Sequence, residues 1–256
     1  MTPGLSRRTV LVTRPAQQAA ALAQAIQTAG GSAFIFPALE IEAVPATALS
    51  EPLARLAGAD SVIFISPNAA HYGMAALHSG GCKLPASAQC FAVGPGTARA
   101  LAERGVRGVV TPDGQDSEAL LALPQLQAVA GKRVVIVRGV GGRPLLADTL
   151  RARGAEVNYL ECYRRVRPQA DAAALLACWQ SGGIDAVTVT SAETLHNLAA
   201  LLGDAGMPLL LRTPLFAPHE KIAEAARRFG VAHVIATPGG DAGLVDGLIN
   251  WFRNAP

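Results

Sequence analysis

Short apolar runs alternate along the chain with longer segments in which apolar residues recur every three or four positions. The first run covers residues 10–13, and in the segment after it Leu22 and Ile26 lie four positions apart, ahead of Gly30 and Gly31. This spacing places apolar side chains on one face of a helix, and glycine commonly ends a helix. The pattern predicts short strands alternating with amphipathic helices, which is typical of an α/β fold with parallel sheets covered on both faces.

The second half of the chain repeats the pattern of the first, displaced by about 124 positions. Arg138 ends an apolar run as Arg14 does, and Gly154 ends the following helical segment as Gly30 does. Three later segments repeat in the same order, namely 62–67 as 186–191, 91–95 as 214–218, and 111–114 as 237–240. We therefore expect two lobes of similar construction.

Two extended segments hold corresponding places in the two halves, at residues 32–44 and 156–168. In the second segment Val157, Tyr159 and Cys162 alternate with more polar positions, which predicts a strand with one face packed and one face in water. We interpret the parts of these segments around residues 36–44 and 158–167 as natural links between the lobes.

Polar residues follow most of the predicted strands, where ligands bind in open α/β sheets. Hydroxyls, basic side chains and free N–H groups at helix N-termini are suited to carboxylates or phosphates. The positions are Arg14, Ser66, residues 94–97, Thr111, Arg138, Ser191, Pro218, His219 and Thr237. Two such rims facing each other would form a cleft for a small anionic molecule.

Some of these residues also have a purely structural interpretation. Ser66, Ser191, Thr111 and Thr237 precede helices, where hydroxyl side chains usually serve as caps. Their recurrence at matched positions, and a basic residue at the same strand end in both halves, favour a binding role.

Composition narrows the function classes. The chain has 256 residues, which is enough for two domains of about 100 to 150 residues each. A net charge of +3 with scattered Lys and Arg, and only 5% aromatic residues, argue against a nucleic-acid partner and leave a small anion open. The sequence has neither a signal-sequence pattern nor an apolar stretch of about 20 residues, so we expect a cytoplasmic protein without a membrane partner.

The sequence offers no motif for a cofactor or a metal. Cys82, Cys90, Cys162 and Cys178 lack C-x-x-C spacing, and we expect them to be reduced and structural. The five histidines lie far apart and predict no metal site. Residues 139–144 lack the third glycine of a dinucleotide fingerprint, so we expect chemistry without a cofactor.

A set of short motifs runs in order along nearly the whole chain. They are V-L-V-T-R-P at the start, F-I-S-P-N-A at 64–69, A-V-G-P-G-T-A at 92–98, V-R-G-V-G-G-R at 137–143, L-x-x-R-G-A at 150–155, Y-R-R at 163–165, T-S at 190–191 and A-P-H-E-K-I-A at 217–223. Each motif is short, but the ordered set resembles the uroporphyrinogen-III synthase family.

The resemblance implies two similar α/β lobes joined by a two-stranded antiparallel linker, with the chain crossing between the lobes twice. On this sequence one lobe would be residues 1–37 with 167–256, the other residues 44–158, and the linker strands residues 38–43 and 159–166. The repeat would then cross the lobe boundary. The resemblance also implies a monomer.

The resemblance implies a lyase of haem biosynthesis whose substrate is hydroxymethylbilane, a linear tetrapyrrole with an acetate and a propionate on each pyrrole. Ring A loses its hydroxyl, ring D attacks through its substituted carbon, and the ring closes with ring D inverted. Tyr163 would be the catalytic residue that assists departure of the hydroxyl, because a phenol is protonated at neutral pH. The residues expected to bind substrate are Arg14, Ser66, Asn68, Thr97, Arg138, Ser191, His219 and Thr237.

Two of the expected functional positions depart from the repeat. His219 stands where the first half has Gly96, and Leu39 stands where the second half has Tyr163.

Two other functions remain open. A two-lobed protein that binds a small anion without chemistry has the same repeated architecture. A cofactor-dependent enzyme on a doubly wound sheet is disfavoured by the incomplete glycine loop. Tyr163 by itself has the pattern of a half-buried strand aromatic.

Overall fold

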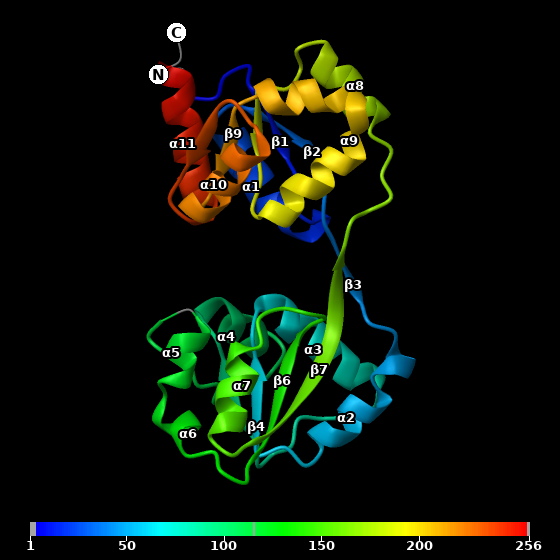
Figure 1. The fold of residues 1–256 in the computed structure, drawn as a ribbon, viewed down its shortest axis with the longest axis vertical. Coiled ribbons are helices and arrows are strands. Elements are labelled where there is room, and N and C mark those ends of the chain that lie inside the picture. The colour runs from blue at the N-terminus through cyan, green and yellow to red at the C-terminus, as the bar shows by residue number, and fades with distance from the viewer. Residues whose placement is uncertain (1–3, 115, 255–256) are drawn as a thin grey trace. The chain divides into compact units, whose positions relative to one another are not determined.

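The computed structural model describes residues 4–114 and 116–254 and separates the chain into two α/β units (Figure 1). Unit 1 comprises Met1–Glu40 and Val166–Pro256, and unit 2 comprises Ile41–Arg165. The first strands of the chain therefore pack with its last third, while the middle of the chain forms a unit of its own.

Unit 1 is built on a five-stranded sheet in which all neighbouring strands are parallel. The order across the sheet is β10 (Val234–Ala236), β9 (Leu215–Ala217), β8 (Ala186–Thr188), β1 (Thr9–Val12) and β2 (Ser32–Ile35). The strands are short and apolar because both faces of the sheet are covered.

Helices cover both faces of this sheet, as the alternation of buried side chains requires. Val10 and Val12 on β1 pack in one apolar cluster with α1 (Ala16–Thr28) and α11 (Gly240–Asn254). Leu11, between them, points to the other face and a second cluster. That cluster includes side chains of α8 (Ala173–Gln180), α9 (Ala192–Arg212) and α10 (Glu220–Phe229).

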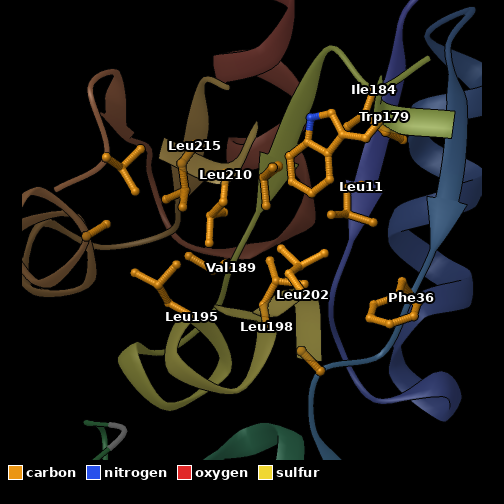
Figure 2. Close-up of a cluster of buried hydrophobic side chains, with 14 of the residues drawn as sticks. Leu11, Phe36, Trp179, Ile184, Val189, Leu195, Leu198, Leu202, Leu210 and Leu215 are labelled. Atoms are coloured by element: carbon orange, nitrogen blue, oxygen red, sulfur yellow. The ribbon is translucent and has the colours of Figure 1, made fainter. Parts of the chain in front are cut away.

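The second cluster is the larger core of unit 1. Figure 2 shows Leu195, Leu198 and Leu202 of α9 projecting from one side of the helix toward Val189 and Leu11. Their spacing of three and four positions is the helical period that the sequence pattern predicts. Helix α9 is interrupted at Gly203, whose φ of 58° lies in the left-handed region that favours glycine.

Unit 2 has a five-stranded sheet in the order β3-β7-β6-β4-β5. The strands are β3 (Glu40–Ala43), β7 (Glu156–Val166), β6 (Arg133–Gly139), β4 (Ser61–Phe64) and β5 (Gln89–Ala92), of which the last four are mutually parallel. The predicted α/β class with parallel sheets is confirmed in both units.

Two apolar clusters again lie on opposite faces of the unit 2 sheet. One contains residues of α2 (Ser50–Leu56), α3 (Pro67–Ser79) and α4 (Pro95–Ala102). The other contains residues of α5 (Ser117–Leu121), α6 (Pro124–Gln127) and α7 (Leu145–Ala152). A short 3-10 helix, η1 (Ala46–Ala48), connects β3 to α2.

The internal repeat is visible in the strand order. Strands β1 and β2 begin at Thr9 and Ser32, and β6 and β7 begin at Arg133 and Glu156, each 124 positions later. The first pair lies in the unit 1 sheet and the second pair in the unit 2 sheet. Each sheet therefore combines strands from both halves of the chain.

Strand β7 departs from the simple alternation expected for it. Val157 and Cys162 pack in clusters on opposite faces of the sheet, so the expectation of one packed and one wet face is wrong. The pairing register with β6 shifts, since Arg138 pairs with Glu161 but the next residue, Gly139, pairs with Tyr163. This β-bulge leaves Cys162 as an extra residue and turns both Cys162 and Tyr163 toward the same cluster.

None of the helices within the described ranges 4–114 and 116–254 is long and apolar enough to span a membrane.

The core around α9 provides a stability test. Replacing Leu198, which is fully buried, with alanine should lower the free energy of unfolding by about 2–5 kcal/mol, since a cavity replaces packed apolar atoms. The matched control is Leu145→Ala, because that leucine is 37% exposed and should change stability by less than about 0.5 kcal/mol. Urea unfolding followed by circular dichroism measures both, and equal losses would contradict the described packing.

Candidate functional site

A pocket of about 290 Å³ opens in unit 2 at the carboxyl ends of β6 and β7. Residues 139–143, between β6 and α7, form one wall, and Tyr159, Tyr163 and Arg165 of β7 form another. Asp116 and Ser117 at the start of α5 complete the rim. The pocket therefore lies where ligands bind in open α/β sheets.

The bulge in β7 places Tyr163 at this pocket. The side chain is only 2% exposed, and its ring lies against Gly139 on the neighbouring strand. A methyl group at position 139 would come within 2.6 Å of the tyrosine ring, so only glycine fits there without movement. The first glycine of the loop is thus required by the tyrosine rather than by a dinucleotide.

The hydroxyl of Tyr163 lies 3.1 Å from Ser66 Oγ, and either oxygen can be the donor. Ser66 is the N-cap of α3, where its Oγ accepts a hydrogen bond from the backbone N–H of Ala69 at 3.1 Å. The interpretation of Ser66 as a helix cap is confirmed. Because the cap fixes Ser66 Oγ, it also fixes the hydrogen-bond partner of Tyr163.

Tyr72 also lies beside the tyrosine ring. The centroids of the Tyr72 and Tyr163 rings are 5.6 Å apart, and the Tyr72 hydroxyl donates to the carbonyl of Ile41 at 2.7 Å. Burial raises the pKa of Tyr72 above its ordinary value, because the anion would lose hydration. Tyr72 is therefore a neutral structural neighbour of Tyr163.

Arg138 forms the basic part of the pocket. Its guanidinium is centred 4.8 Å from the ring centroid of Tyr159, and its Nε donates to the carbonyl of Gly139 at 3.2 Å. Glu161 Oε1 lies 3.8 Å from Arg138 Nε and accepts the backbone N–H of Gly141 at 3.2 Å. Glu161 thus holds both the arginine and the glycine loop.

Basic side chains outnumber carboxylates among the residues that line the pocket, although Glu161 and Glu118, outside the lining, pair with Arg138 and Arg143. Arg138, Arg143 and Arg165 line it, whereas Asp116 is the one carboxylate among its lining residues in the described chain. The Asp116 carboxylate is already engaged, because it accepts the backbone N–H of Ala119 at 2.7 Å as the N-cap of α5. The arrangement suits an anionic ligand.

Cys162 precedes Tyr163 on β7, is 1% exposed and does not line the pocket. Its thiol lies 3.5 Å from the carbonyl of Arg138. Burial raises the pKa of this thiol to about 12, so Cys162 is neutral at physiological pH. This residue packs and does not act as a nucleophile.

Of the unit 2 residues expected from the sequence to bind substrate, only Arg138 lines this pocket, and Ser66 contacts it only through the Tyr163 hydroxyl. Asn68 lies in the first turn of α3, and Thr97 is buried in the first turn of α4 at 4% exposure. The structure therefore brings together Tyr163, Ser66 and Arg138, and leaves Asn68 and Thr97 at neighbouring strand ends.

The remaining four expected residues, Arg14, Ser191, His219 and Thr237, lie in unit 1 just after the carboxyl ends of β1, β8, β9 and β10. They share one edge of that sheet, but none of them lines the Tyr163 pocket.

Arg14 has a carboxylate partner within unit 1. Its guanidinium pairs with Asp241 in the first turn of α11, while its buried Nε has no hydrogen-bond partner in the described chain. Asp241 was not expected from the sequence, since the residues are far apart along the chain and only the sheet order joins them.

The side chains of Ser191 and His219 are used in different ways. Ser191 is the N-cap of α9 and accepts the backbone N–H of Thr194 at 3.0 Å, so its interpretation as a cap is confirmed. The exposed His219 ring lies close to Gly239, which places it beside the loop that follows Thr237.

The cap interpretation is wrong for the two threonines. The hydroxyl of Thr237 contacts the carbonyls of Ala217 and Pro238, and α11 begins only at Gly240. Thr111 is exposed, and Asp116 caps the helix that follows it. In both loops extra residues separate the threonine from the first helical turn.

Sequence reasoning missed Tyr159 and Glu161, which position Arg138. Both precede Tyr163 on β7, and their spacing of two residues was the available signal, because such residues share one face of a strand.

Within the part of the chain that the structure describes, no three His, Cys, Asp or Glu side chains are grouped as metal ligands.

Residues 20–246 match the family model described as Uroporphyrinogen-III synthase HemD. The chain is 38% identical over 226 residues to the uroporphyrinogen-III synthase of Salmonella typhimurium (strain LT2), with 86% of this chain and 91% of that protein covered. The uroporphyrinogen-III synthase of Escherichia coli (strain K12) matches with the same identity and coverage.

Solved structures show the same fold. A mutant uroporphyrinogen III synthase from Thermus thermophilus superposes with a TM-score of 0.64 at 22% identity, covering 96% of this chain and 99% of that one. The uroporphyrinogen-III synthetase of Helicobacter pylori gives a TM-score of 0.56 at 13% identity, covering 93% and 97%. These structures support the fold alone, because their sequences have diverged.

Replacing Gly139 with alanine should displace the Tyr163 ring and lower the free energy of unfolding by about 1–3 kcal/mol, the usual cost of overpacking. The control is Gly96→Ala, whose added methyl would meet nothing closer than 3.8 Å and should cost nothing. Urea unfolding measures both variants. A Gly139→Ala protein as stable as wild type would show that the ring does not occupy this position.

The raised pKa of the Cys162 thiol predicts that the protein loses stability in alkali. The unfolded thiol ionises near its ordinary pKa of 9.0 while the folded thiol keeps its proton until about pH 12, so the unfolded state binds fewer protons between these values. Stability falls there as pH rises, by up to about 1.4 kcal/mol per pH unit. The difference in unfolding free energy between wild type and Cys162→Ala should therefore shrink above about pH 9. A difference independent of pH in urea unfolding would contradict the raised pKa.

Proposed function

The chain belongs to the uroporphyrinogen-III synthase family, and from that premise we propose how its own residues serve the reaction. The protein is the lyase of tetrapyrrole biosynthesis that cyclises hydroxymethylbilane, with loss of water and inversion of ring D, to uroporphyrinogen III. The family assignment disfavours the alternative of a two-lobed anion-binding protein without catalysis.

The chemistry requires help at one bond. The C–O bond of the hydroxymethyl group on ring A breaks, the oxygen leaves as water after gaining a proton, and an azafulvene cation remains. Ring D then attacks through its substituted carbon, and the spiro intermediate breaks and closes again with ring D inverted. A proton donor near the departing oxygen accelerates such a step by about 10²- to 10⁴-fold.

We assign the donor role to Tyr163. Its hydroxyl is held by Ser66 at 3.1 Å, and its ring lines the basic pocket of unit 2. As Tyr163 donates toward the departing oxygen, Ser66 Oγ can turn its own proton toward the phenol oxygen and stabilise the charge that develops there. The observation that carries this assignment is that Tyr163 lines the pocket while its hydroxyl is hydrogen-bonded to Ser66.

The arginines of the pocket suit the substrate's carboxylates. Arg138 is held by Tyr159 and Glu161, whereas Arg165 is exposed and has no ion-pair partner in the described chain. Hydrogen bonds to charged groups contribute about 1.5–3 kcal/mol each. A pocket of about 290 Å³ is small for a whole tetrapyrrole, so it holds a part of the substrate.

We further propose that Asn68 and Thr97 in unit 2, and Arg14, Ser191, His219 and Thr237 in unit 1, contact substrate carboxylates. Their positions just after strand ends, where N–H groups of helices are free, support this role. In unit 1 the substrate carboxylate would compete with Asp241 for Arg14.

The proposal also covers the linker strands between the lobes, the oligomeric state and the cellular location of the enzyme. We propose that residues 38–43 and 159–166 form a two-stranded antiparallel linker, supported by the adjacency of β3 and β7 and by the Arg164–Glu42 ion pair at 2.9 Å. We propose a monomeric, cytoplasmic enzyme. The four cysteines are free thiols, as expected in a reducing compartment.

The activity is tested by supplying hydroxymethylbilane to the purified protein and resolving the porphyrin isomers after oxidation. The inverted isomer should predominate. Accumulation of only the uninverted isomer at the uncatalysed rate would remove the enzyme assignment.

Replacing Tyr163 with phenylalanine should lower turnover by about 10²- to 10⁴-fold, since the proton donor is lost, and should weaken product binding far less. The matched control is Tyr72→Phe, which keeps the neighbouring ring, loses only the hydrogen bond to Ile41, and should leave turnover unchanged. Steady-state rates and product titrations measure the two effects. Unchanged turnover in Tyr163→Phe would exclude the phenol from the mechanism.

A further inference from the structure

A second pocket of unit 2, with a volume of about 670 Å³, lies at the amino-terminal end of β5. It is formed by the C-terminal part of α3, the segment leading into β5 and the segment that follows α4; α3 and α4 are labelled in Figure 1. It shares no lining residue with the Tyr163 pocket, which lies at the carboxyl ends of the strands. The volume is within the range of about 300–1,000 Å³ that is typical of small-molecule sites.

The inner part of this pocket is apolar. Leu77 is 2% exposed, and Met74, Leu84 and Val106 are half-buried around it. These side chains belong to the apolar cluster on this face of the sheet, so the pocket is an opening into packed core. Flexible methionine and leucine side chains adapt to an apolar ligand.

The rim of the pocket is basic. Lys83, Arg104 and Arg107 line it, and no Asp or Glu is among its lining residues in the described ranges. Arg104 donates to the carbonyl of Ala100 and so compensates the C-terminal end of α4. Lys83 and Arg107 are exposed and have no hydrogen-bond or ion-pair partner within residues 4–114 and 116–254.

Helix ends do not cancel this charge. Helices α3 and α4 both end at the pocket, and each C-terminus carries about half a negative elementary charge. Three basic side chains therefore leave a net charge of about +2 next to the apolar interior. Uncompensated cations beside an apolar opening are complementary to a molecule with a carboxylate at one end and an apolar body.

We propose that this pocket binds an amphipathic carboxylate, with its apolar body among Met74, Leu77 and Leu84 and its carboxylate at Lys83 and Arg107. The site is separate from the Tyr163 pocket, so binding there does not depend on the proposed reaction. Decanoate is a suitable probe, because it combines one carboxylate with a flexible apolar chain.

The chain contains its own reporter of occupancy. Cys82 lines the pocket, is half-buried, and lies 3.4 Å from the carbonyl of Gly80. Cys178 is a free, half-buried thiol in unit 1, outside the pocket, and serves as an internal control. Peptide mass spectrometry after brief treatment with N-ethylmaleimide measures the alkylation rate of both thiols in the same sample.

Decanoate at about ten times its dissociation constant should slow alkylation of Cys82 about tenfold, because only the unoccupied fraction reacts. The rate at Cys178 should not change, and decanol at the same concentration should protect Cys82 much less. No protection of Cys82, equal protection of both thiols, or equal protection by decanol would each overturn the proposal.

A double variant, Lys83→Gln with Arg107→Gln, should raise the decanoate concentration that gives half-maximal protection of Cys82 at least about twofold, since each exposed charge contributes a factor of about 1.4 to 5. The matched control is Arg99→Gln with Lys132→Gln, which removes two exposed charges of unit 2 that do not line the pocket. An unchanged Cys178 rate and circular dichroism spectrum verify folding. Protection as strong as wild type in the first variant would overturn the carboxylate assignment.

Discussion

The contact between the Tyr163 ring and Gly139 is the constraint on which the arrangement of the unit 2 pocket depends. The β-bulge at Cys162 turns the tyrosine toward β6, and the ring fits only because position 139 has no side chain. With the ring in place, its hydroxyl meets Ser66, the residue that caps α3. One packing contact thereby links the sheet register, the cap of α3 and the position of the Tyr163 hydroxyl.

The same glycine-rich segment also shapes the charge of the pocket. Gly142 lies so close to Arg138 that a side chain there would collide with the guanidinium, and Gly141 donates its N–H to Glu161. The loop is therefore folded around an arginine held by Tyr159 and Glu161, instead of around a pyrophosphate. A preorganised cation and a positioned phenol are what a reaction needs when it must hold an anionic substrate and release one hydroxyl.

Much of the fold follows from sequence pattern, but the fine geometry of the site does not. The period of Leu22 and Ile26, and the strand at Val134 with its neighbours, predict elements that the structure contains. The bulge at Cys162 has no local sequence signal, because it depends on how β7 pairs with β6. For that reason the alternation predicted for β7 fails at Cys162 and Tyr163.

Long-range partners account for the other differences. Asp241 pairs with Arg14 only because β1 and α11 meet in unit 1, which residue spacing cannot indicate. Thr237 precedes a helix in the sequence as Ser66 does, yet its hydroxyl is used by backbone carbonyls because the loop before α11 is longer. Motif order identified the family, whereas side-chain roles depended on the tertiary structure.

The central claim is that Tyr163 assists departure of the ring A hydroxyl, and leaving-group dependence in single-turnover kinetics tests it most directly. Wild type and Tyr163→Phe would be compared on hydroxymethylbilane and on an analogue in which a carboxylate ester replaces the hydroxyl, since a carboxylate departs without a proton. We predict a large rate deficit in the variant with the natural substrate and little deficit with the ester. Equal deficits with both substrates would contradict a role for the phenol as proton donor.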